Sequence, residues 1–95
     1  MWEQVGRLHE HHGDVSAERR LLKVTEEVGE AAEALIGMQG GNSRKPPRSR
    51  GDLLDELSDV IIAGAIAMTG VAGDVDRARE HLERRLAAVC ERAGL

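Results

Sequence analysis

Aromatic residues are nearly absent from this sequence of 95 residues, which holds one Trp, Trp2, and no Phe or Tyr. β-Sandwiches and barrels draw on aromatic and β-branched residues for their inner faces, so the composition favours a helical core of aliphatic and alanine side chains. Modules that stack nucleic-acid bases on aromatic side chains are excluded for the same reason. A formal net charge of -4 is a second argument against a nucleic-acid polymer as partner.

Cysteine is equally scarce, because Cys90 stands alone and has no partner for an intrachain disulfide. The chain opens with no charged-then-apolar signal segment. Its apolar run over residues 60–72 is shorter than the roughly 18 residues that suggest a membrane span. The sequence therefore predicts one cytoplasmic domain over residues 1–95, without a membrane partner.

Apolar residues at helical spacing predict an all-α domain of the four-helix-bundle type. Ser16, Asp52 and Asp74 are the predicted N-caps of the last three helices, with Asp55 three residues after Asp52 in the manner of a capping box. The predicted helices cover residues 2–12, 17–38, 52–70 and 75–93, with Gly70 and Gly73 as breaks before the last.

Two apolar surfaces follow from these helices. The second helix carries a predicted inward stripe formed by Leu21, Val24, Val28, Ala31, Ala32 and Leu35. The third helix is apolar on every side over residues 60–72, which predicts a centrally buried segment. One small chain has difficulty covering such a helix, so the sequence also predicts assembly as an oligomer.

Two matched acid pairs are the most informative chemical feature. Glu27 and Glu30 lie three residues apart on the second helix, and Glu56 and Asp59 repeat the spacing on the third, so each pair shares a helix face. Both pairs lie at the edge of an apolar seam. If the two helices pack antiparallel, the four carboxylates converge on one point.

Converging carboxylates repel one another and require cations. Oxygen ligands favour Mg²⁺, Mn²⁺ or Ca²⁺ over zinc, and the absence of a His at the end of either pair points away from iron and toward Mg²⁺. The alternative is a structural role, in which the acids are solvated or form helix ion pairs such as Lys23 with Glu27.

The segments over residues 25–34 (TEEVGEAAEA) and 55–61 (DELSDVI) resemble the E-E-x-x-E and E-x-x-D signature of the MazG-like all-α nucleoside triphosphate pyrophosphohydrolases. The resemblance implies a dimer or higher homo-oligomer that binds Mg²⁺, with Mn²⁺ as the alternative ion. It also implies cleavage of a (deoxy)nucleoside triphosphate to the monophosphate and pyrophosphate. Glu27, Glu30, Glu56 and Asp59 match the metal ligands of the family. Glu26 matches a less uniformly used position, and we assign to it a role in orienting water or supporting the metal ligands.

Two further sets of residues are candidates for this chemistry. Glu26 and Glu30 are candidate catalytic bases, because a carboxylate not fully committed to the metal accepts the proton of the attacking water. Basic residues over positions 44–50 place positive charge beside the acids, and the predicted substrate-binding residues are Asn42, Arg44 and Lys45. The alternative for this basic loop is a solvated segment without a ligand.

Other functions remain open at this point. The phosphoribosyl-ATP pyrophosphohydrolases share the acidic pattern and a similar length. A helical dimer that binds metal or nucleotide without turnover satisfies the same residues. The last helix also reads HLERR over residues 81–85, where family members often carry a Lys and Asn pattern.

Overall fold

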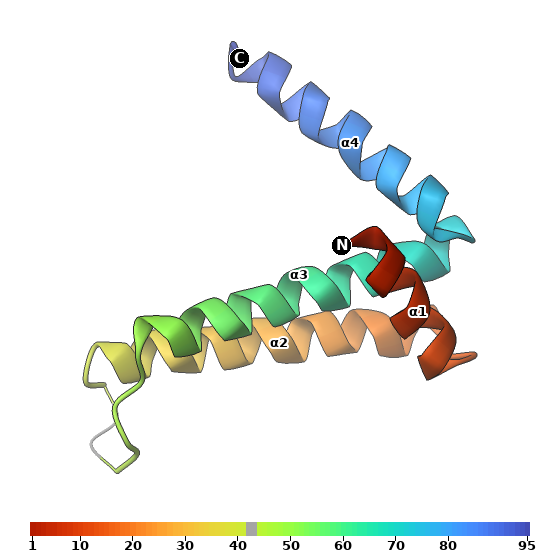
Figure 1. Ribbon diagram of the computed structural model, residues 1–95. Helices are drawn as coiled ribbons and strands as arrows, with labels where there is room; N and C mark the ends of the chain where they lie inside the picture. Colours follow the sequence, from red (N-terminus) through yellow and green to blue (C-terminus); the bar gives the residue numbers. More distant parts are fainter. Residues whose placement is uncertain (42–43) are drawn as a thin grey trace.

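A computed structural model describes residues 1–41 and 44–95, and every secondary-structure element in these ranges is a helix (Figure 1). The four helices are α1 (Trp2–His12), α2 (Ala17–Met38), α3 (Arg50–Ala72) and α4 (Val75–Arg92). The predicted all-α class is confirmed, and α1 and α2 have the predicted bounds.

Side-chain caps explain where α2 and α4 begin. The Ser16 hydroxyl accepts a hydrogen bond from the backbone N–H of Arg19 at 3.2 Å, and the Asp74 carboxylate accepts one from the N–H of Arg77 at 2.8 Å. Each bond satisfies a backbone donor that has no partner inside its helix. Both predicted caps are confirmed.

The start of α3 differs from the prediction. Ser49 is the N-cap, and its hydroxyl accepts from the N–H of Asp52 at 3.1 Å, while Asp52 Oδ2 accepts from the N–H of Ser49 at 2.8 Å. This is a complete capping box, in which Asp52 is the third residue of the helix. The prediction that Asp52 caps the helix and that Asp55 is its third residue is wrong.

The end of α3 sets the direction of α4. Gly70 lies inside α3, so its predicted role as a break is wrong, and the helix ends at Ala72. Gly73 follows with a φ of 99°, a left-handed conformation that favours glycine, and its N–H donates to the carbonyl of Thr69 at 3.0 Å. A bend of 112° separates α3 from α4 at this turn.

Two helices, α2 and α3, form an antiparallel pair, and the other two, α1 and α4, pack at one end of it. α2 and α3 lie side by side along their length, and α1 packs against α3 and α4 (Figure 1). α4 extends away from the pair, and in the described part of the chain it makes no packing contact with α2. Small side chains dominate the buried apolar core, which consists of Val5, Ala31, Ala34, Ala65 and Ala78. The four helices therefore do not close into a bundle within one chain.

The apolar surfaces of α2 and α3 differ from the predicted ones. The buried side of α2 consists of Arg20, Glu27, Ala31 and Ala34. The predicted stripe is largely exposed, with 65% of Leu21 and 51% of Val28 accessible, because α3 covers only one side of α2. Central burial of residues 60–72 is also not reached within one chain, since Ile61 is 60% exposed and Val71 78% exposed.

Within the described residues, no helix taken singly is both long enough and apolar enough to cross a membrane.

Candidate metal site

Three carboxylates meet where α2 packs against α3, and we call Glu27, Glu30 and Glu56 the acidic cluster. One carboxylate oxygen from each lies within 4.8 Å of the other two. Glu27 and Glu30 share a face of α2 because they lie three residues apart, and Glu56 approaches from the second turn of α3. Glu27 is buried, Glu56 half-buried and Glu30 exposed, so the cluster leads from the helix seam to solvent.

Two oxygens of this cluster lack a partner. Glu27 Oε2 and Glu56 Oε2 are both buried, and neither has a hydrogen-bond partner among the residues that the structure describes. A buried polar atom without a partner costs about 1–3 kcal/mol, and more when it carries charge. A divalent cation with oxygen-preferring chemistry satisfies both atoms, so the residues present fit such an ion.

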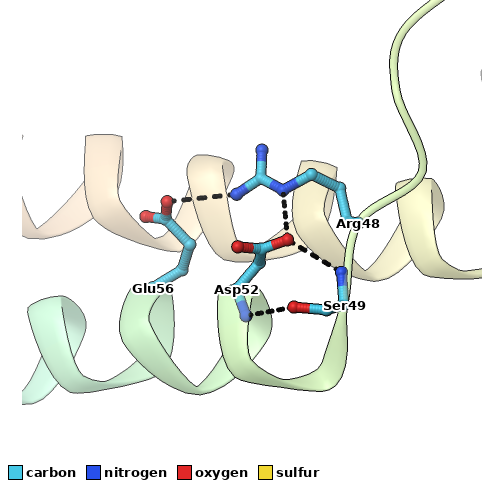
Figure 2. A network of polar contacts seen from close by, with 4 residues as sticks. All are labelled: Arg48, Ser49, Asp52 and Glu56. Carbon is cyan, nitrogen blue, oxygen red and sulfur yellow. Dashed lines mark hydrogen bonds and ion pairs between the residues drawn. The ribbon is translucent and has the colours of Figure 1, made fainter.

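The other oxygen of each carboxylate is held by a basic side chain. Lys23 Nζ lies 2.9 Å from Glu27 Oε1, and Arg48 Nη2 lies 3.4 Å from Glu56 Oε1 (Figure 2). The hydrogen bond with Glu27 is the main reason that the pKa of Lys23 is raised above its ordinary value, and the negative charge of Glu27 adds to it. These two ion pairs balance part of the negative charge of the cluster.

Repulsion within the acidic cluster raises the pKa of Glu30. The negative charge of Glu27 raises the pKa of Glu30, and the close approach of the Glu56 carboxylate raises it further. Repulsion between like charges disfavours the ionised form of an acid. The cluster therefore holds more negative charge than its basic neighbours balance.

The remaining predicted acids lie beside the cluster. Asp59 is exposed and lines a cavity together with Glu27, but its carboxylate is not one of the three that lie within 4.8 Å of one another. Glu26 is 66% exposed at its side chain and lies 3.7 Å from Lys23 Nζ. The structure thus brings together three of the four predicted metal ligands.

A cavity of about 540 Å³ adjoins the cluster between α1, α2 and α3. Its apolar lining residues are Leu8, Val15, Ile62, Ala63 and Ile66, and its charged lining residues are Arg19, Arg20, Lys23, Glu27 and Asp59. Binding sites for small molecules commonly combine an apolar bed with a few convergent polar groups. This cavity has both features and shares Glu27 with the acidic cluster.

The predicted substrate-binding residues lie in the connection between α2 and α3. Arg44 and Lys45 are exposed there, and Asn42 lies outside the described residues. Figure 1 shows this connection at the end of the α2–α3 pair that is remote from α1. From this connection, Arg48 reaches Glu56 of the acidic cluster (Figure 2).

Sequence reasoning missed the individual roles of Arg48 and Arg20. The i, i+4 spacing of Arg48 and Asp52 is a local signal for their ion pair, whose Nε to Oδ2 distance is 3.6 Å. Arg20 is buried at the start of α2, where its Nε donates to the carbonyl of Val15 and its Nη2 to that of Gly13, at 3.1 and 2.9 Å. Arg20 lies seven residues before Glu27 and eleven before Ala31, so helical spacing places it on the buried side of α2, whereas Arg19 is exposed.

Comparison of the chain with protein-family models, with curated proteins and with solved structures finds no match.

Proposed function

We propose that this protein is a divalent-cation-dependent nucleoside triphosphate pyrophosphohydrolase of the MazG-like kind. The observation that carries the proposal is the pair of buried, unpartnered carboxylate oxygens, Glu27 Oε2 and Glu56 Oε2, in an acidic cluster shared by α2 and α3. The motifs over residues 25–34 and 55–61 supply both carboxylates, and these are the motifs that resemble the family. Geometry and resemblance therefore select the same residues.

Glu27, Glu30 and Glu56 would hold Mg²⁺ or Mn²⁺, with Asp59 as the fourth candidate ligand. Bound there, the ion supplies charge neutralisation for the triphosphate and a more acidic water. In the reaction, a water oxygen bonds to the α-phosphorus, the bond from that phosphorus to the bridging oxygen breaks, and pyrophosphate leaves. The proton of the water passes to a carboxylate of the chain.

Two carboxylates are candidates for that proton. Glu30 is exposed, and the negative charges of Glu27 and Glu56 raise its pKa, which favours uptake of a proton. Glu26 is exposed and lies near Lys23 rather than in the cluster. The cavity beside Glu27 would receive the nucleoside on its apolar lining residues, and Arg44 and Lys45, together with Asn42, would contact the phosphates.

The test is release of pyrophosphate from a panel of ribonucleoside and deoxyribonucleoside triphosphates with Mg²⁺. Glu27→Gln keeps the shape of the side chain and removes the ligand charge, so it should lower kcat by about a hundredfold or more. Glu33→Gln, an exposed position of the same helix, is the matched control and should retain activity.

Other outcomes separate the alternative functions. Turnover of phosphoribosyl-ATP in preference to every nucleoside triphosphate would assign the chain to that activity. Binding of Mg²⁺ by calorimetry without turnover of any nucleotide would leave a non-catalytic binding protein. Full activity in Glu27→Gln would show that the proposed site is wrong.

We also infer that the chain works as a homo-oligomer. Its accessible surface is 7204 Å², whereas a compact monomer of 10.3 kDa exposes about 5,400 Å². Its radius of gyration is 15.9 Å, against about 12 Å for a compact domain of this length. The excess of about 1,800 Å² per chain is about twice the roughly 800 Å² that each partner buries in a standard protein interface, and large apolar side chains contribute to it.

A further inference from the structure

Arg48 connects the loop to the acidic cluster. Its Nη2 lies 3.4 Å from Glu56 Oε1 and its Nε 3.6 Å from Asp52 Oδ2 (Figure 2). The residue directly precedes Ser49, the N-cap of α3, so its backbone is anchored at the start of the helix. Its side chain is 37% exposed, and the guanidinium thus lies at the boundary between the helix seam and solvent.

The aliphatic part of Arg48 occupies a recess on α2 that depends on Gly37. A Cβ atom built on Gly37 would overlap Arg48 Cγ and lie 3.1 Å from Arg48 Cβ. Any larger residue at position 37 would therefore displace the Arg48 side chain. The contact of Arg48 with Glu56 therefore requires a glycine at position 37 of α2, unlike the contacts of an ordinary surface arginine.

The two carboxylate oxygens of Glu56 have different surroundings. One oxygen faces the Arg48 guanidinium, and the other is buried without a partner. A divalent cation bound by Glu56 and Glu27 would stand close to the positive charge of Arg48, and like charges at such a distance repel. The guanidinium and the cation therefore compete for the same carboxylate.

A displaced guanidinium would remain next to the site, because Ser49 and the capping box hold the backbone of Arg48 in place. Guanidinium groups bind phosphate through paired hydrogen bonds. A phosphate ligand of the bound cation brings negative charge to this position.

We propose that Arg48 is a counterion built into the cation site, which neutralises Glu56 in the cation-free chain and transfers to the phosphates of a cation-bound ligand. The inference rests on the proposed cation site and adds a positioning residue to it. Arg48 has opposite effects on two ligands of one site: it weakens the binding of Mg²⁺ alone and strengthens the binding of a phosphate ligand when Mg²⁺ is present.

The experiment is two calorimetric titrations of Arg48→Gln, the first with Mg²⁺ alone and the second with inorganic pyrophosphate at saturating Mg²⁺. The dissociation constant of Mg²⁺ should fall by about three- to fivefold, which is the upper end of the scale of a partly exposed ion pair. The dissociation constant of pyrophosphate should rise by about the same factor. Arg50→Gln removes an equal charge two residues away, from an exposed side chain, and should change both constants less than about twofold.

Gly37→Ala provides a test without any change of charge. The added methyl group displaces the Arg48 side chain, so Mg²⁺ should again bind more tightly, although the net charge of the protein is unchanged. In the Arg48→Gln background, Gly37→Ala should have no further effect on Mg²⁺ binding, because the side chain that it displaces no longer carries a guanidinium. Circular dichroism confirms that each variant is helical.

The outcomes separate this inference from the proposed function. If the parent protein binds no Mg²⁺, the cation site itself is wrong and the inference fails with it. If the parent binds Mg²⁺ but Arg48→Gln and Arg50→Gln shift its affinity equally, only the role of Arg48 is overturned. The same holds if Arg48→Gln leaves the binding of pyrophosphate unchanged.

Discussion

The raised pKa of Glu30 means that its negative charge destabilises the cation-free folded state. For an acid whose pKa is higher in the folded state, this destabilisation is fully present above the folded pKa. It disappears as the pH falls to the ordinary pKa of the acid, 4.5. Glu30→Gln removes the charge that Glu27 and Glu56 repel. We expect this variant, in chelator, to melt at a higher temperature than the parent at neutral pH.

Thermal melts followed by circular dichroism from neutral pH down to pH 4.5 check the expectation, and the parent should approach the variant as the pH falls. Glu33→Gln on the same helix should not show the effect. Added Mg²⁺ should stabilise the parent more than Glu30→Gln, since a ligand stabilises only the state that binds it. A cation-free Glu30→Gln protein that melts below the parent would mean that Glu30 makes a favourable contact instead.

At the level of single residues, the sequence predicts part of the candidate site. Spacing places Glu27 and Glu30 on one face, and antiparallel helices bring Glu56 to them. Asp59 repeats the spacing of three residues from Glu56, but it is not one of the three carboxylates that meet, and it lines the adjoining cavity instead. The position of Arg48 depends on the path of a loop and on a recess at Gly37, and neither can be read from periodicity.

At the level of elements, the capping box of α3 predicts a pH-dependent contribution to stability. The hydrogen bond from the N–H of Ser49 is the main cause that lowers the pKa of Asp52, and the Ser49 side chain and the charge of Arg48 add to it. An acid with a lowered folded pKa contributes stability above its ordinary value of 3.8, and the contribution is lost as the pH falls through the folded pKa.

Ser49→Ala removes the side-chain cap and should destabilise the protein by about 1 kcal/mol, or about 4–8 °C in melting temperature. Asp52→Asn should also melt lower at neutral pH, and its difference from the parent should shrink below pH 3.8. Asp55→Asn is the matched control, because Asp55 is exposed and outside the capping box, and it should change stability by less than about 0.5 kcal/mol. Equal melting temperatures for Asp52→Asn and Asp55→Asn would contradict the capping role.

The bounds of α2 follow from its sequence because Ser16 and the glycines after Met38 are unambiguous signals. The start of α3 offers two compatible readings, since Ser49 and Asp52 are both good cap residues. Gly51 is a poor helix former and favours the later start. The earlier start prevails because it forms two reciprocal hydrogen bonds, whereas a cap at Asp52 would leave the Ser49 side chain without this role.

At the level of the whole molecule, the sequence predicts four helices but not their closure. The direction of α4 depends on the conformation of Gly73, and the bend of 112° carries the apolar side chains of α4 away from α2. Leu82 and Leu86 are 41% and 60% exposed as a result. Uncovered apolar surface of this kind is what the proposed homo-oligomer would bury.

We expect the proposed contact between copies to lie on α3. Leu54, Leu57 and Ile61 lie at spacings of three and four along this helix and are each 45–60% exposed, so they form one uncovered stripe. In a twofold dimer each substitution counts twice. Ile61→Gln should therefore weaken a dimer by about 2–4 kcal/mol, or roughly thirtyfold to a thousandfold in dissociation constant.

Sedimentation velocity over a range of concentrations measures the effect directly, and the melting temperature of the parent should rise with protein concentration because association stabilises the folded chain. Leu95→Gln is the control, since Leu95 is 90% exposed at the end of the chain and lies outside every helix. We expect Leu95→Gln to sediment like the parent. A parent protein that sediments as a monomer at micromolar concentration would refute self-association, and a dimer that tolerates Ile61→Gln would exclude this face of α3 as the interface.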